Sequence, residues 1–132
     1  MTDIAAYLAE IEVAFINSPA VVEYQVVRSW DHGDDGYIRV RATLSNGDFL
    51  EAAEYAALEQ DRIQTIDYRH HWSDGSRKLR QRWDSTPHHP ELANFPHHVH
   101  LGNEDTLSPS QAISIVQVLR ILEIEIANSA TE

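Results

Sequence analysis

The sequence predicts an α+β domain with an N-terminal helix, a five-stranded antiparallel meander sheet, a proline- and histidine-rich loop and a C-terminal helix packed on the sheet. Three observations lead to this prediction. Apolar residues recur at helical spacing near both ends of the chain, and they alternate with polar residues through the middle. Turn residues separate the alternating segments into short strands. Strands between two helices are typical of a sheet with helices on one face.

The N-terminal helix is predicted to run to about Asn17. Either Thr2 or Asp3 can act as its N-cap, and Ser18-Pro19 ends it. Its apolar positions follow one another at the spacing of a single buried face: Ile4, Leu8, Ile11 and Phe15. This helix is therefore expected to cover the sheet.

Five segments are predicted to be strands: residues 21–30, 37–44, 49–58, 63–72 and 78–84. The second is the clearest, because apolar residues alternate with polar ones through eight positions, so that one face is buried and the other carries Arg39 and Arg41. The third is rich in alanine and glutamate, a composition equally compatible with a helix. The face that carries the two arginines is expected to be the working surface.

Turn signals join these strands. The segment His32-Gly33-Asp34-Asp35-Gly36 and the pair Asp74-Gly75 each predict a change of direction. Asn46-Gly47 predicts a hairpin with a type I′ turn, because both residues accept a positive φ.

The C-terminal helix is predicted over residues 109–127. Ser108 would be its N-cap and Pro109 its first residue. Its apolar positions form a stripe wider than one sheet face requires: Ala112, Ile113, Ile115, Val116, Val118, Leu119, Ile121, Leu122, Ile124 and Ile126. The helix is therefore either almost enclosed or an interface, and we expect a homodimer or a docked partner.

Length and composition limit the function. The chain of 132 residues is long enough for one domain, residues 1–132, and its lack of cysteine excludes disulfides and thiolate metal sites. No signal peptide or membrane span is evident, so a cytoplasmic protein without a membrane partner is expected. The net charge of −11 argues against general nucleic-acid affinity. A basic strip at residues 62–82, with six bases against two acids, still leaves room for a local RNA site.

Histidine is concentrated in one part of the chain. Seven of the eight histidines lie between His70 and His100, and five of these share a segment with Pro87, Pro90 and Pro96. Each proline fixes its own φ and keeps the preceding residue out of the helical region, which predicts a stiff, extended loop. A stiff loop holds a site in place at a lower entropic cost than a flexible one.

The first interpretation of this loop is acid–base chemistry. Imidazole titrates near neutrality, so two histidines can act as the base and the acid of metal-independent RNA cleavage, with an arginine stabilising the phosphorane. The candidate catalytic residues are His88, His89, His97, His98, His100 and Asp84. The candidate substrate-binding residues are Arg80, Arg82, Tyr68, His70, Trp72 and Trp83, the aromatic ones as stacking surfaces for unpaired bases.

Two other interpretations remain open. His88, His98 and His100, with Asp84, can converge on zinc or another divalent metal, although no helical His-x-x-x-His pair is present. Alternatively, the histidines are architectural and donate to loop carbonyls, in a non-enzymatic module whose C-terminal helix binds a partner. The acid–base interpretation requires no cofactor.

Three segments together resemble one protein family. They are Tyr68-Arg69-His70-His71-Trp72, the run from Arg82 to Pro90 and the run Phe95-Pro96-His97-His98-Val99-His100. They are similar to the signature of the TumE family, toxins encoded beside a helix-turn-helix antitoxin. The chain departs from that signature at Ser85-Thr86, where the family usually has Asn-Ala. The resemblance implies a toxin that acts on RNA and binds its cognate antitoxin.

Overall fold

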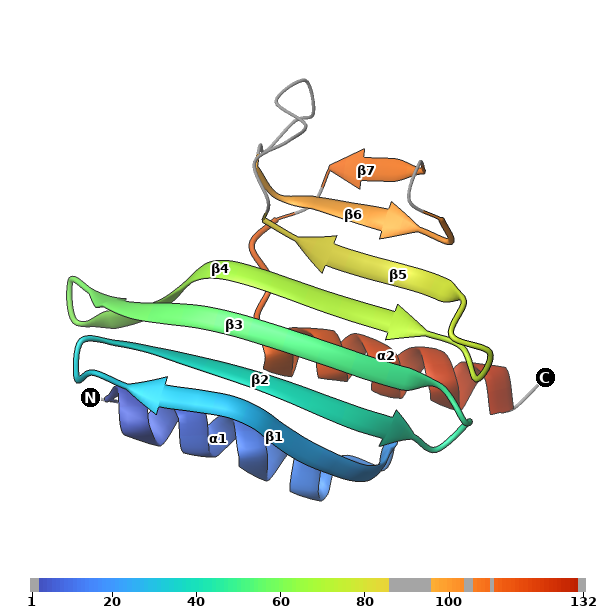
Figure 1. Cartoon of the computed structure of the whole chain (residues 1–132), viewed down its shortest axis with the longest axis horizontal. Coiled ribbons are helices and arrows are strands. Elements are labelled where there is room, and N and C mark those ends of the chain that lie inside the picture. The colour runs from blue at the N-terminus through green and yellow to red at the C-terminus, as the bar shows by residue number, and fades with distance from the viewer. Residues whose placement is uncertain (1–2, 86–95, 104–105, 110, 131–132) are drawn as a thin grey trace.

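The chain folds as one helix, seven strands and a second helix (Figure 1). The structure is a computed structural model, and it describes residues 3–85, 96–103, 106–109 and 111–130. The elements are α1 (Ile4–Asn17), β1 (Val21–Asp31), β2 (Asp35–Leu44), β3 (Phe49–Glu59), β4 (Arg62–Ser73), β5 (Leu79–Asp84), β6 (His98–Leu101), β7 (Leu107–Pro109) and α2 (Ile115–Ala130). The predicted α+β class and the predicted N-terminal helix are confirmed.

All seven strands form one antiparallel sheet in chain order, β1 to β7. The five predicted strands are present, and the third segment is a strand in spite of its alanines and glutamates. The predicted total of five is wrong, because β6 and β7 extend the sheet beyond β5. These additional strands have four and three residues, too few for a pattern of alternation to be recognised in the sequence.

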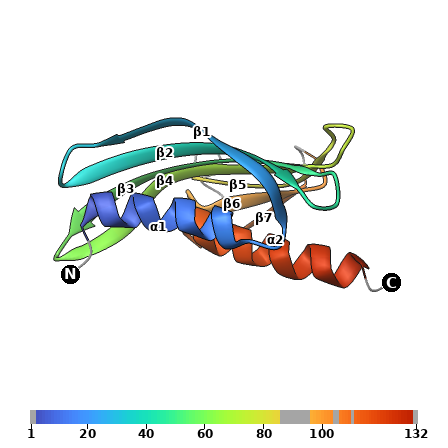
Figure 2. The same cartoon turned by 90° about the horizontal axis from the view of Figure 1, so that it is seen from below.

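Both helices lie on the same face of the sheet (Figure 2). Apolar side chains of β2 and β3, among them Val40 and Leu50, are buried against apolar residues of the helices such as Phe15 and Leu119. The alternation in β2 decides this arrangement, because every second side chain faces the helices. The opposite side of the sheet, which carries Arg39 and Arg41, is called the open face below.

The second helix begins six residues later than predicted. Pro109 is the last residue of β7, and Ile115 is the first residue of α2. Ser114 is the N-cap: its hydroxyl accepts from the Gln117 amide at 3.2 Å, and the Gln117 side chain accepts from the Ser114 amide at 2.9 Å. This reciprocal capping box outweighs the Ser-Pro signal upstream, because it satisfies backbone donors at the start of the helix.

One turn also differs from the prediction. The hairpin at Asn46-Gly47 has a positive φ at Gly47 alone, so it is not the predicted type I′ turn, which requires a positive φ at both central residues. That sign pattern occurs instead at Gln60 and Asp61, with φ values of 50° and 63°, in the two-residue connection from β3 to β4. The change of direction at Gly33 is confirmed.

The structure revises the predicted histidine loop in part. Arg82 and Asp84 belong to β5, as the predicted strand at residues 78–84 implies. His98 and His100 belong to β6, so the C-terminal end of the predicted loop is a strand. His88 and His89 lie outside the described residues. None of the described helices is long and apolar enough to cross a membrane.

Candidate functional site

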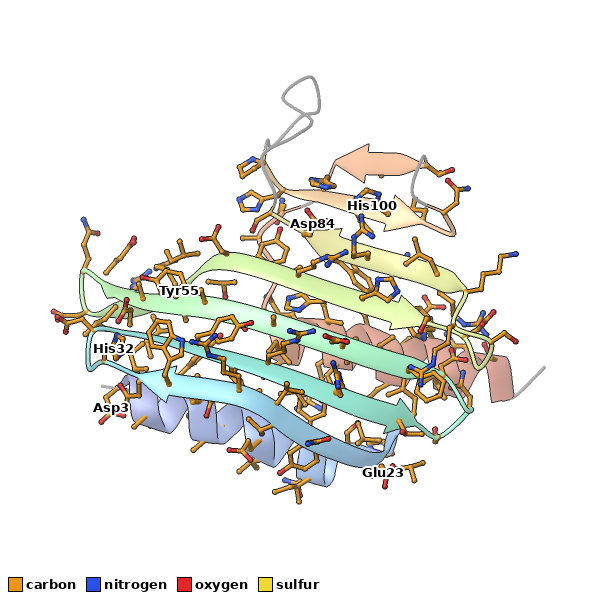
Figure 3. The ribbon with its side chains drawn as sticks, viewed as in Figure 1. Asp3, Glu23, His32, Tyr55, Asp84 and His100 are labelled. Carbon is orange, nitrogen blue, oxygen red and sulfur yellow. The ribbon has the colours of Figure 1, made fainter. Side chains whose placement is uncertain are left out.

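Strand pairing decides which side chains of β4, β5 and β6 share a face. Directly paired residues of antiparallel strands project to the same side of a sheet. Asp84 pairs with Arg69 and His98, and Arg82 pairs with His71 and His100, which places all of these on the open face. Figure 3 shows Asp84 and His100 on the neighbouring strands β5 and β6. The intervening Trp83, paired with His70 and Val99, faces the helices.

Four polar side chains form the cluster at this point: Arg82, Asp84, His98 and His100. Asp84 is 1% exposed, and its Oδ2 atom accepts a hydrogen bond from Nε of Arg82 at 3.1 Å. The Oδ1 atom lies 3.0 Å from Nε2 of His98, and Oδ2 lies 3.5 Å from Nε2 of His100. One carboxylate thus contacts one guanidinium and two imidazoles. A buried charge of this kind is tolerated only when it is paired in this way.

The two histidines in the cluster face different partners. Nδ1 of His98 lies 2.9 Å from the carbonyl oxygen of Pro96, and its Nε2 faces the Asp84 carboxylate. Both partners are acceptors, so the surroundings of His98 suit a ring that donates hydrogen. Nε2 of His100 lies 3.0 Å from Nη2 of Arg82, which can only donate. Nε2 of His100 thus lies closest to a donor, with Oδ2 of Asp84 farther away at 3.5 Å.

Three residues of the cluster, Asp84, His98 and His100, are also of the types that bind metal ions. Ligand atoms of Asp84, His98 and His100 all lie within 4.8 Å of one another, so the predicted pair His98 and His100 is joined by a carboxylate. The atoms that a cation would need, Oδ2 of Asp84 and Nε2 of His100, both contact the Arg82 guanidinium. A second positive charge at that point would be repelled by the first. The donor set therefore suits proton transfer better than metal binding.

Most of the predicted substrate-binding side chains lie elsewhere. Arg80 bonds Asp48, with its Nε 2.7 Å from Oδ2, and the same carboxylate accepts from Trp72 Nε1 at 2.8 Å. Tyr68, Trp72 and Trp83 are buried in the core beneath the helices, where an RNA base cannot stack on them. Of the predicted cations and aromatic residues, Arg82 alone is brought to the four-residue cluster.

His70 and His97 belong to the helix side of the sheet. Nε2 of His70 lies 2.9 Å from the carbonyl oxygen of Ile113, just before α2, and burial lowers the pKa of His70 to about 4, against the smaller opposing effect of that hydrogen bond. Nδ1 of His97 lies 2.9 Å from the Tyr68 hydroxyl. Burial, followed by the charge of Asp84, raises the pKa of Tyr68. These contacts hold α2 to the sheet and lie outside the cluster.

Glu54 is a buried carboxylate that the sequence reasoning missed. It is 1% exposed and accepts from the backbone amide of Ile115 at 2.9 Å and from the Thr65 hydroxyl at 2.8 Å. The Tyr7 hydroxyl also bonds this carboxylate, and burial, followed by the charge of Glu54, raises the pKa of that phenol. The signal was present in the sequence, since Glu54 occupies the same strand parity as the apolar Ala52 and Ala56.

The comparisons with known proteins identify one family. Neither the curated proteins nor the solved structures include a match to this chain. The family model described as toxin TumE matches residues 11–129, which takes in all seven strands and nearly all of α2. The match confirms the resemblance first noticed in the histidine-rich segments, and the chain therefore belongs to the TumE family of toxins.

Proposed function

We propose that this toxin cleaves RNA by metal-independent acid–base catalysis at Arg82, Asp84, His98 and His100. The observation that supports the proposal most strongly is the difference between the two imidazoles. His98 faces two acceptors, the Pro96 carbonyl and the Asp84 carboxylate, whereas the nearest partner of Nε2 in His100 is the donor Nη2 of Arg82. The surroundings of His98 therefore suit a general acid, and those of His100 suit a general base. Pairs of titratable groups held in different states by their neighbours are typical of acid–base sites.

In the proposed reaction, the ribose 2′-oxygen bonds the adjacent phosphorus while the bond from phosphorus to the 5′-oxygen breaks. Nε2 of His100 takes the proton of the 2′-hydroxyl. His98 keeps Nε2 on Asp84, exchanges the contact of its Nδ1–H with the Pro96 carbonyl for one with the departing 5′-oxygen, and gives that oxygen the Nδ1 proton. Arg82 exchanges its contact with His100 for one with the phosphorane oxygens, whose charge it stabilises. Asp84 orients His98 and compensates its charge. The products are a 2′,3′-cyclic phosphate and a 5′-hydroxyl.

The decisive experiment is incubation of the purified toxin with single-stranded RNA in EDTA, followed by analysis of the RNA ends. We expect cyclic phosphate ends and a loss of at least about a hundredfold in rate for His98→Gln or His100→Gln, the usual size of a general acid–base contribution. His70→Gln is the matched control, because it removes an imidazole on the opposite face and keeps a donor for the Ile113 carbonyl. Folded toxin that cuts no RNA would contradict the proposal.

Burial favours a second candidate function. His98 and His100 are 1% and 2% exposed, as expected if the cluster only fastens β6 to β5 in a non-enzymatic binding module. That alternative predicts a loss of stability in both histidine variants and no cleavage by the parent protein. Circular dichroism of the same variants, recorded beside the cleavage assay, separates the two functions.

The family membership also implies an antitoxin partner. We propose that this partner is the helix-turn-helix antitoxin of the same module, and that both proteins act in the cytoplasm, where RNA is available. We further propose that the toxin is a homodimer through α2, because Ile124 on that helix is 61% exposed.

A further inference from the structure

Arginines align across the strands of the open face. Arg28 of β1 pairs with Arg39 of β2, Arg39 pairs with Ala53 of β3, and Ala53 pairs with Arg69 of β4. The next residue in this line is Asp84 of the four-residue cluster. We call Arg28, Arg39 and Arg69 the arginine row. It leads across the sheet directly to the proposed catalytic groups.

The arginine row is positively charged on a chain whose net charge is −11. Arg28 and Arg69 are exposed and have no carboxylate partner among the described residues. Arg39 bonds Glu51 through Nε at 2.7 Å and also through Nη2, which leaves its Nη1 donors for another ligand. Burial opposes ionisation of Glu51, but Arg39 and then Arg41 hold the pKa of its carboxyl below its usual range. The row thus retains donors for an anion.

Aromatic side chains lie in the next line of paired residues. Trp30 stacks on Tyr37 with ring centroids 6.1 Å apart, and its ring centroid lies 6.0 Å from that of Tyr55. Each of these three rings is partly exposed, and we call them the aromatic platform. Figure 3 shows Tyr55 toward the end of the sheet where β1 turns into β2, on the same side as His32, which also stacks on Trp30. The other two tryptophans, Trp72 and Trp83, are buried.

A hollow lies between the arginine row and the aromatic platform. It has a volume of about 480 Å³ and is lined by Tyr37, Arg39, Glu51, Ala53, Arg69 and His71. Ala53 forms its floor between two arginines, because a small side chain there leaves the space above the sheet open. Donors for phosphate thus stand beside flat apolar rings, with room between them.

We propose that the open face binds single-stranded RNA, with phosphates on the arginine row and unpaired bases on the aromatic platform. This inference rests on the proposed function, for which it supplies the substrate class and its path. Stacking on side chains requires bases that are not already stacked in a duplex. Tyr55 and Asp84 are two strands apart and offset by two residues along the strands, roughly 12 Å at ordinary strand geometry, so a base on the platform lies within a few nucleotides of the cluster.

Binding can be measured separately from cleavage by using a short fluorescent RNA whose 2′-oxygens are methylated. Such an RNA cannot form the cyclic phosphate, so its anisotropy reports binding alone. Arg28→Ser/Arg69→Ser is expected to weaken binding at least about tenfold and to reduce the slope of log K against log salt concentration by about 1.4, since each phosphate contact on a single strand contributes about 0.7. The matched control is Arg62→Ser/Arg120→Ser, which removes the same charge outside the row. A less than twofold change is expected for the control.

Fluorescence tests the aromatic platform. Because Trp72 and Trp83 are buried, acrylamide should quench mainly Trp30, and bound RNA should protect it. Trp30→Leu should remove that protection and weaken binding by about tenfold, as loss of one stacked base does. A duplex of the same sequence should bind more weakly than the single strand.

The outcomes separate this inference from the proposed function. If methylated RNA binds through the arginine row but unmodified RNA is never cut, the proposed RNA-binding surface is supported and the proposed ribonuclease activity is contradicted. If Arg28→Ser/Arg69→Ser and the control Arg62→Ser/Arg120→Ser cleave RNA equally well, the proposed RNA-binding surface is overturned and the proposed ribonuclease activity is not affected. Variants that bind RNA normally but no longer bind the antitoxin also overturn the inference, because the face would then recognise protein.

Discussion

His70 on the helix side of the sheet and His98 and His100 on the open face are all buried, but their surroundings differ. His70, beneath α2, contacts one backbone carbonyl, and within the described part of the chain no carboxylate or guanidinium bonds to its ring. His98 and His100, on the open face, lie next to Asp84 and Arg82. Burial without an opposite charge favours the neutral ring, whereas burial beside a carboxylate supports a charged one.

This difference indicates which imidazoles can exchange protons. His70 is held neutral and serves to connect β4 with the start of α2. In the open-face pair each ring lies next to the Asp84 carboxylate, and that of His100 also contacts the Arg82 guanidinium, as the proposed proton transfer requires. Histidine content alone therefore does not locate a site, and the charged neighbours of each ring decide its role.

The largest loss of stability is expected when Asp84 of the open-face cluster is replaced. Asp84→Ala leaves the buried Arg82 guanidinium without its carboxylate, and we expect a loss of about 3–5 kcal/mol in the free energy of unfolding. Glu51→Ala is the matched control, because it breaks an arginine pair that is about 40% exposed and should cost no more than about 1 kcal/mol. Urea denaturation measures both. Equal losses would show that the cluster is no more tightly coupled than a surface pair.

The pH dependence of stability tests whether His70, on the helix side of the sheet, is held neutral. The pKa of His70 is about 4 in the folded protein and about 6.5 in an unfolded chain, so the unfolded state binds more protons between these values. Stability is therefore unaffected by His70 above pH 6.5, falls as the pH decreases below it and reaches its full penalty below about 4. At pH 5 the penalty is about 2 kcal/mol.

His70→Gln removes this group and keeps a donor for the Ile113 carbonyl. Urea denaturation at pH 7.5 and pH 5 should show that the parent protein loses about 2 kcal/mol more than the variant between the two values. Parallel losses in both proteins would mean that His70 is not held neutral.

The smallest effect on the fold is expected on the outer side of the helix layer. Ile113 and Ile121, part of the predicted interface stripe, pack partly against the core, and Ile124 is a large apolar residue of α2 that is 61% exposed. Ile124→Glu should convert the proposed dimer to a monomer in light scattering and change the stability of the folded chain by only about 0.5 kcal/mol. Leu119→Glu, at a fully buried position, should unfold it. A monomeric parent protein would contradict the dimer.

The sequence predicted those parts of the fold that have a regular period. The N-terminal helix and the five longer strands have enough residues for an alternation or a helical face to be recognised. β6 and β7 do not, because their form depends on pairing with β5 rather than on local pattern. The start of α2 was misplaced because two valid N-cap signals compete, and only tertiary packing selects Ser114.

The candidate site was predicted by residue type rather than by arrangement. Asp84, His98, His100 and Arg82 were all named from the sequence, and the structure brings them together. Tyr68, His70 and Trp83 were expected nearby but face the helices, because adjacent residues of a strand point to opposite sides. The register that decides between these faces cannot be obtained from the sequence alone.

The order of strands in the sheet also bears on the synthesis of the toxin. Each strand pairs only with its neighbours in the chain, so α1 and the first four strands can assemble while the remainder is still being translated. The two histidines of the cluster lie on β6, and the start of α2, which bonds Glu54, comes later still. The proposed catalytic groups can therefore come together only after β6 has been synthesised. A nascent chain that has not yet reached β6 lacks both of the proposed catalytic histidines, so an antitoxin can bind the earlier strands before the site has formed.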